Sequence, residues 1–279
     1  MTMLPSTTVP SSRDPRHTPA WRSWSDPLLV IAVVLALWQT GSTLGWLQTV
    51  RFPAPTRLAQ SLWELIVDGY PQGVTLGTHF AITMQRIVGG FLAAVALALP
   101  IGWLIGWYPA LDRLTGTSVA FCRSVATLSL LPLALIWFGT GEASKLFLIG
   151  YGCFWVMLSN VIAAVQQVDP VLIRAARTMD ANRFDIFLRV VVPAALPQIF
   201  AGARIALGVG FMVIVGAEMI GTIVGLGALI MEARTFYRSD ITMVGMFVLG
   251  ALGFAIGSGL EWIEKRLMPW HERVRRSGP

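Results

Sequence analysis

The chain has 279 residues, of which 55% are hydrophobic and only 13% are charged, and its mean hydropathy is +0.66. Soluble domains carry about 25% charged residues, so this composition excludes an ordinary soluble protein. Several windows of about 20 residues contain little or no charge, which is the length that crosses a bilayer. The composition therefore predicts an all-α polytopic membrane protein, and the net charge of +6 is attributed to topology signals rather than to a nucleic-acid partner.

The N-terminal part divides into three predicted segments. Residues 1–26 are rich in Pro, Ser and Thr, contain no signal-peptide core, and are expected to form an uncleaved cytoplasmic tail. Residues 27–77 are predicted to hold the first span, at about 27–47, followed by an amphipathic helix on the outer membrane surface. A packed linker helix is the alternative for that second element.

Residues 78–263 are predicted to form the core of the protein. Further spans are expected at about 78–107, 114–138, 145–168, 194–219 and 241–263, which brings the total to six. Gly102 and Gly106 have the small-xxx-small spacing that lets helix backbones approach closely. Residues 221–240 are a glycine-rich connection, and Cys122 and Cys153 are interpreted as buried hydrophobes rather than a disulfide or metal pair.

The distribution of basic residues predicts the orientation. With six spans, thirteen of the 21 lysines and arginines fall on the face that holds both termini, and five fall on the other. The positive-inside rule then places both termini, the basic tail at 264–279 and the segment 169–198 in the cytoplasm.

The segment 169–198 carries four arginines and therefore does not fit inside a bilayer. Apolar residues in its first half recur with the period of a helix, at Leu172, Ala175, Ala176 and Met179. A second set with the same period follows at Phe184, Phe187, Leu188 and Val191. The pattern predicts two short amphipathic helices in tandem, suited to holding a partner.

The sequence contains no common motif for ATP binding or for catalysis. The chain has two lysines, Lys145 and Lys265, and neither lies in a GxxxxGK[ST] phosphate-binding loop. HExxH, GxSxG and CxxC are also missing, and the three histidines lie far apart in the sequence. The sequence therefore predicts that the chain is not an enzyme and holds no metal.

The segment 174–197, RAARTMDANRFDIFLRVVVPAALP, resembles the cytoplasmic EAA loop of binding-protein-dependent ABC importer permeases, with matches at Ala175, Ala176, Pro193 and Pro197. Three further stretches resemble the nitrate, sulfonate and taurine branch in the same order: LLPLALIWFGTGEASK at 130–145, GARIALGVGFMVIVGAEM at 202–219 and RLMPWH at 266–271.

Two positions depart from the family pattern. Arg174 stands where the family has Glu, and Asp180 stands where it has Gly. Asp tolerates the left-handed backbone conformation, so we expect the bend between the two short helices to survive. Arg174 reverses a charge at the expected contact with the partner subunit.

The resemblance implies a type I ABC importer permease whose coupling loop, residues 169–193, docks on two ATP-binding subunits. Those subunits would hold ATP and Mg²⁺, while this chain would need no cofactor. A second copy of the chain and an external substrate-binding protein are also implied. The coupling residues would be Arg174, Ala175, Ala176, Met179, Asp180, Phe184 and Phe187. The alternative is that these apolar faces pack on the chain's own spans.

Charged residues within predicted spans are costly and indicate function by default. Arg86, Arg123, Arg204 and Glu218 are therefore candidates for a substrate pathway with positive potential. Arg86 and Arg204 lie near span ends, so the alternative for them is that they reach the headgroups. Glu218 has the alternatives of pairing with an arginine or lining an outer gate.

Together these patterns predict a permease subunit of an ATP-driven importer for a small anion such as alkanesulfonate, taurine or nitrate. The expected location is the bacterial cytoplasmic membrane, with lipid as a further partner. An ion-gradient-driven transporter or channel is the alternative, and it would predict inverted repeats with paired charges at the midplane.

Overall fold

The structure is a computed structural model that describes residues 22–44, 52–71 and 73–268. The chain divides into two compact units, residues 1–56 and 57–279. The first unit holds helix α1 (Arg22–Thr43), where a span was expected at 27–47. The tails expected at 1–26 and 264–279 lie mostly outside the described residues.

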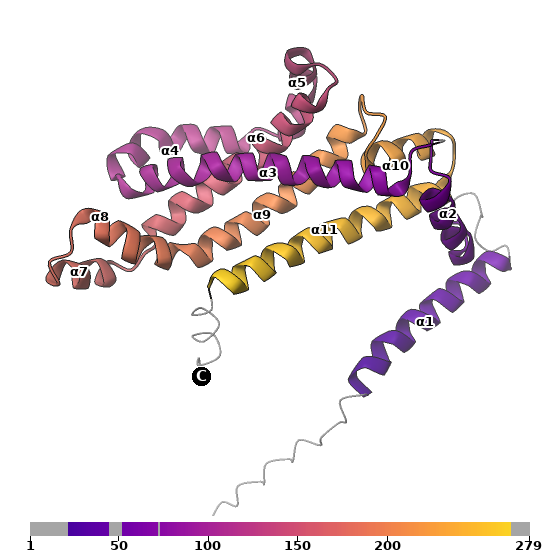
Figure 1. Cartoon of the computed structure of the whole chain (residues 1–279), viewed down its shortest axis with the longest axis horizontal. Helices are drawn as coiled ribbons and strands as arrows, with labels where there is room; N and C mark the ends of the chain where they lie inside the picture. The colour runs from indigo at the N-terminus through magenta and orange to yellow at the C-terminus, as the bar shows by residue number, and fades with distance from the viewer. Residues whose placement is uncertain (1–21, 45–51, 72, 269–279) are drawn as a thin grey trace, which may run out of the picture. The chain divides into compact units, whose positions relative to one another are not determined.

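The core of the second unit consists of three long helices that pack side by side (Figure 1), namely α3 (Leu76–Trp107), α6 (Glu142–Gln166) and α9 (Val192–Glu218). Gly102 and Gly106 of α3 face α6. A Cβ atom on Gly102 would lie 2.7 Å from the Val161 side chain, and one on Gly106 would lie 2.8 Å from Val165. The close helix approach predicted from this glycine spacing is therefore confirmed.

The predicted count of six spans is not confirmed. In the described part of the chain, four continuous helices are long and apolar enough to cross a membrane: α3, α6, the helix running from Arg183 to Glu218, and α11 (Ser239–Leu267). A bent helix pair raises the number to five if the pair is counted as one span.

That bent pair replaces the continuous span expected at 114–138. Helix α4 (Pro109–Ser124) ends early, and the 3-10 helix η1 (Thr127–Leu130) leads into α5 (Leu131–Phe138) at an angle of 79° to α4. Residues 125 and 126 are extended, which interrupts the helical hydrogen bonds. Pro132 stands in the first turn of α5, where a residue without an N–H is tolerated. Figure 1 shows α5 turning away from α4.

The segment 169–198 forms the two predicted helices. Helix α7 (Pro170–Thr178) starts with the Asp169 carboxylate accepting a hydrogen bond from the Val171 N–H at 2.8 Å, and α8 (Arg183–Ile186) is capped by the Asn182 side chain. Asp180 has a φ of 59° between them, which confirms the predicted left-handed bend. The second helix is not separate from the next span, because the π-helix η2 (Phe187–Val191) joins α8 directly to α9.

Two further helices complete the second unit. Helix α2 (Pro55–Val67) is observed where the interfacial helix was expected, and its Ser61 and Leu65 are buried. The glycine-rich connection at 221–240 contains a helix that the sequence analysis missed, α10 (Leu226–Thr235), which packs against α11. Gly221 and Gly225 adopt positive φ in the turn just before it.

Candidate functional site

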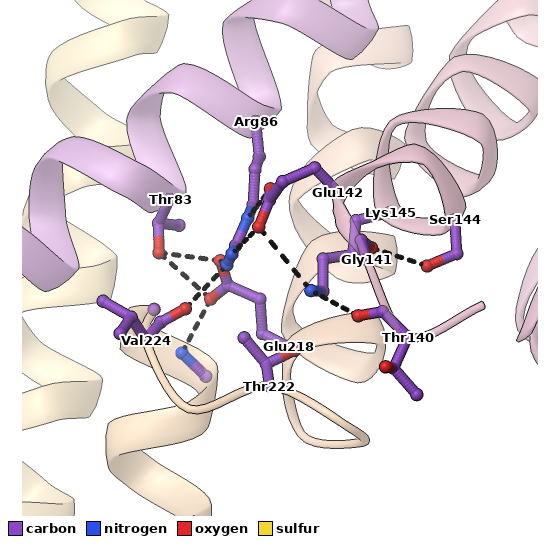
Figure 2. Close-up of polar contacts among 12 residues, drawn as sticks. Thr83, Arg86, Thr140, Gly141, Glu142, Ser144, Lys145, Glu218, Thr222 and Val224 are labelled. Carbon is purple, nitrogen blue, oxygen red and sulfur yellow. Dashed lines mark hydrogen bonds and ion pairs between the residues drawn. The ribbon is translucent and has the colours of Figure 1, made fainter. Parts of the chain in front are cut away.

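A buried arginine is the centre of a polar cluster at one end of the three core helices. Arg86 of α3 is only 4% exposed, and it contacts carboxylates from two other helices (Figure 2). Its Nη1 donates to Glu218 Oε1 of α9 at 2.7 Å, and its Nε donates to Glu142 Oε2 of α6 at 2.6 Å. One guanidinium therefore connects all three core helices, in the forked geometry that suits carboxylates.

Glu218 ends α9 and is 1% exposed. Besides Arg86, it accepts hydrogen bonds from Thr83 Oγ1 at 2.9 Å and from the Gly227 N–H at 2.9 Å. Arg86 Nη1 also donates to the Val224 carbonyl at 2.8 Å. These bonds hold the turn between α9 and α10 against α3.

His79 attaches the same turn from the other side. Its Nδ1 lies 3.0 Å from the Gly225 amide nitrogen, and its Nε2 lies 2.9 Å from the Tyr70 carbonyl oxygen. Nδ1 also lies 2.9 Å from the Gly225 carbonyl oxygen, so the ring contacts both backbone polar groups of Gly225. His79 is thus a buried connector between the turn and the segment before α3.

The cluster is electrically balanced. Lys145 is also buried, with its Nζ 3.8 Å from Glu142 Oε1 and donating to the Thr140 carbonyl at 3.2 Å. Two cations, Arg86 and Lys145, therefore face two carboxylates, Glu142 and Glu218 (Figure 2). A neutral cluster of this kind holds helices together but presents little net positive potential to an anion.

A second polar cluster fixes α2 on the start of α11. Asp240 Oδ2 accepts hydrogen bonds from Ser61 Oγ at 2.8 Å and from Arg238 Nη2 at 3.0 Å. Arg57 Nε lies 3.5 Å from the same carboxylate. Hydrogen bonding to Asp240 raises the pKa of Arg238.

The other two arginines proposed for a pathway lie apart from the Arg86 cluster. Arg204 of α9 pairs with Glu264 of α11 at 2.9 Å. Arg123 lies in the last turn of α4, next to the break before η1, and is exposed. Within the described part of the chain it forms no ion pair.

The coupling loop divides into an exposed and a buried set of side chains. Met179 is 76% exposed and Phe184 is 69% exposed. Ala176 is buried within the chain, and Phe187 packs edge-on against Trp107 and Trp103 of α3, with ring centroids 5.4 and 6.1 Å apart. Arg174, Ala175 and Asp180 are exposed. Of these side chains, Ala176 is buried and Phe187 packs on α3, whereas Met179 and Phe184 stay mostly exposed.

Comparison with known proteins decides the family. The family model for the binding-protein-dependent transport system inner membrane component matches residues 98–270. The taurine transport system permease protein TauC of Escherichia coli is 36% identical over 248 residues, which cover 88% of this chain and 89% of that protein. The chain belongs to this permease family.

Other relatives of this permease agree with that assignment. The putative aliphatic sulfonates transport permease protein SsuC of Bacillus subtilis is 32% identical, with 88% of each chain covered. The bicarbonate transport system permease protein CmpB of Synechocystis is 29% identical, with 87% and 88% covered.

Solved structures confirm the fold class. A chain of the MetNI methionine ABC transporter in an inward-facing conformation aligns with a TM-score of 0.58 at 20% identity. The alignment covers 68% of the permease and 95% of that chain. The permease therefore has the helical fold of a type I ABC importer permease.

Sequence reasoning identified Arg86 and Glu218 but missed the residues that complete their cluster, Thr83, His79, Glu142 and Lys145. A usable signal was present, because a charge placed in a span is stable only beside a partner. Glu142 and Lys145, at the start of α6, were the remaining charges in the motif 139–145.

Proposed function

We propose that this permease carries taurine or a related small sulfonate across a bacterial cytoplasmic membrane as part of an ATP-driven importer. The observation that carries the proposal is the similarity, over 88% of the chain, to permeases named for taurine and for aliphatic sulfonates. A more distant relative is named for bicarbonate, so we place the substrate in the wider class of small anions.

Arg123 is the best candidate for contact with the anion. Arg86 already has two carboxylate partners and Arg204 has one, whereas Arg123 is exposed and unpaired within the described part of the chain. It also lies at the break between α4 and η1, where two residues are extended. Irregular backbone at membrane depth is tolerated where it lines a cavity or is buried in protein.

Uptake by proteoliposomes tests this role. Arg123→Gln is expected to lower taurine uptake at limiting substrate by about 10- to 100-fold, since a hydrogen bond to a charged group contributes roughly 1.5–3 kcal/mol. The matched control is Arg113→Gln, an exposed arginine on the same helix. Equal uptake by both variants would remove Arg123 from the pathway.

The partners in this proposal are a second copy of the chain, two ATP-binding subunits and an external binding protein. ATP and Mg²⁺ belong to the ATP-binding subunits, and the coupling loop provides their docking surface in the cytoplasm. The support from the structure is the exposure of Met179 and Phe184, because large apolar side chains on a polar loop favour a protein contact.

Met179→Asp tests the docking surface. An apolar anchor at the centre of an interface contributes about 2 kcal/mol or more, so we expect the ATP-binding subunit to bind about 30-fold more weakly or worse. Met179→Leu is the matched control because it keeps an apolar side chain. Unchanged co-purification of Met179→Asp with the ATP-binding subunit would contradict the docking role.

The same preparations separate the importer from an ion-gradient transporter. The importer takes up substrate only with ATP inside the vesicles and the binding protein outside. Uptake driven by an ion gradient in the permease alone would establish the alternative. A panel of taurine, alkanesulfonates, nitrate, bicarbonate and a cationic control then defines the substrate class.

A further inference from the structure

A cavity of about 480 Å³ lies between the C-terminal end of α3 and helix α8. Its lining is dominated by aromatic rings, together with one cation: Trp103, Trp107, Tyr108, Phe184, Phe187 and Arg183. Phe187 packs against both tryptophans and so fixes the α8 side of the cavity to α3. Trp and Tyr collect where membrane helices leave the hydrocarbon, so this composition is typical of the headgroup level.

An apolar track on α3 leads to the cavity. Leu97, Ile101 and Leu104 are all exposed and recur at i, i+4 and i+7, so they lie on one face of the helix. Tyr108 follows at the end of the same face. At a rise of 1.5 Å per residue, the track from Leu97 to Tyr108 is about 16 Å long. That length matches one leaflet, which is half of the ~30 Å hydrocarbon core.

The charge at the cavity is uncompensated. Arg183, the first residue of α8, is exposed and forms no ion pair within the described residues. None of the described residues that line the cavity is an aspartate or a glutamate. An arginine without a carboxylate beside an apolar wall complements a phosphodiester, because the guanidinium fork matches phosphate oxygens.

We propose that this cavity binds an anionic phospholipid of the cytoplasmic leaflet. The phosphodiester pairs with Arg183, one acyl chain follows Leu97, Ile101 and Leu104, and the bound lipid supports α8 from the membrane side. This inference rests on the proposed function, which places the coupling loop in the cytoplasm. Phosphatidylglycerol is the probe, since the cytoplasmic leaflet attracts basic residues through its anionic lipids.

The test is retention of lipid by the purified full-length permease, measured by native mass spectrometry after reconstitution in phosphatidylcholine with and without phosphatidylglycerol. Wild type is expected to retain phosphatidylglycerol in preference to phosphatidylcholine. Arg183→Gln is expected to weaken that retention about fivefold, the contribution of one basic residue near an anionic surface. Arg177→Gln, an exposed arginine of the same loop outside the cavity, is the matched control and is expected to behave as wild type.

Three outcomes would overturn the proposal. The first is that wild type and Arg183→Gln retain phosphatidylglycerol equally. The second is that Arg177→Gln loses as much phosphatidylglycerol as Arg183→Gln, which would indicate that the basic loop attracts anionic lipid without a specific site. The third is that the ATP-binding subunit displaces the lipid, which would make the cavity a pocket for that partner's side chain. Taurine uptake by the same wild-type preparation is a separate readout, so failure of the proposed transport function leaves the lipid result interpretable.

Discussion

Removing the buried arginine at the centre of the polar cluster is the most direct test of what holds the core helices together. Arg86→Met leaves the Glu218 carboxylate, 1% exposed, with only Thr83 and the Gly227 N–H as hydrogen-bond donors. Breaking a buried ion pair by removing one partner costs about 3–5 kcal/mol. At about 2–4 °C per kcal/mol, the midpoint of thermal unfolding is expected to fall by roughly 6–20 °C.

Glu218→Gln is expected to destabilise less, because Arg86 keeps its two contacts with Glu142. In the double variant the uncompensated carboxylate is gone, and Glu142 still has Lys145 nearby. Glu218→Gln should therefore partly rescue Arg86→Met, by about 2 kcal/mol or roughly 4–8 °C. If the two substitutions act independently, their losses of stability add, and the double variant shows no rescue.

The assay is the thermal midpoint of the permease in detergent, followed by fluorescence and by loss of monodisperse protein. Glu261→Gln is the control, since Glu261 forms an exposed pair with Lys265 and its loss should leave the midpoint unchanged. Two outcomes would refute the reasoning that a charge pair joins the helices. One is that Arg86→Met unfolds at the same midpoint as wild type. The other is that the double variant is less stable than Arg86→Met.

The remaining predictions use the same midpoint. Gly225→Ala should lower the midpoint of thermal unfolding, since φ is +145° and a Cβ would lie 2.6 Å from the Glu218 carboxylate. Gly208→Ala is the matched control, because Gly208 lies in a helix with open space around it, and it should raise the stability by about 0.5–1 kcal/mol. Asp180→Val should destabilise by about 1–3 kcal/mol at φ 59°, while Asp180→Gly should be tolerated. Deleting Arg189 from the π-helix should preserve folding, whereas deleting the exposed Ile205 from regular α9 should not.

The elements predicted best were those with long apolar runs or a complete local signal. The bounds of α6 and α11 fall within a few residues of the spans expected at 145–168 and 241–263. The left-handed bend at Asp180 was expected from the family resemblance, because the family has Gly at this position and Asp tolerates the same backbone conformation. The spans depended on local sequence, and the bend depended on the resemblance as well.

The continuous span expected at 114–138 was wrong because it ran through the polar stretch 123–129, RSVATLS, where the structure bends. Helix α10 was missed because Gly221, Gly225 and Gly227 make residues 221–240 look like a connection. Two of those glycines are explained by packing in the folded chain, since a side chain at Gly225 or Gly227 would collide with Glu218. The charges of the polar cluster signalled that partners were needed, but hydropathy does not show which of the distant helices supplies each partner.

The π-helix connects the coupling loop to the polar cluster through a single helical element. From Arg183 to Glu218 the chain runs for 36 residues, so one rod of about 54 Å joins the two ends. Ile186 and Val191 are both buried and lie five residues apart. In an α-helix, five residues would turn the second side chain about 140° away from the first. In a π turn, which bonds residue i to residue i+5, both side chains lie on one face. The extra residue therefore keeps Ile186 and Val191 on one buried face of the helix. Deleting Arg189 restores the four-residue spacing of an α-helix, which is why that deletion should fold.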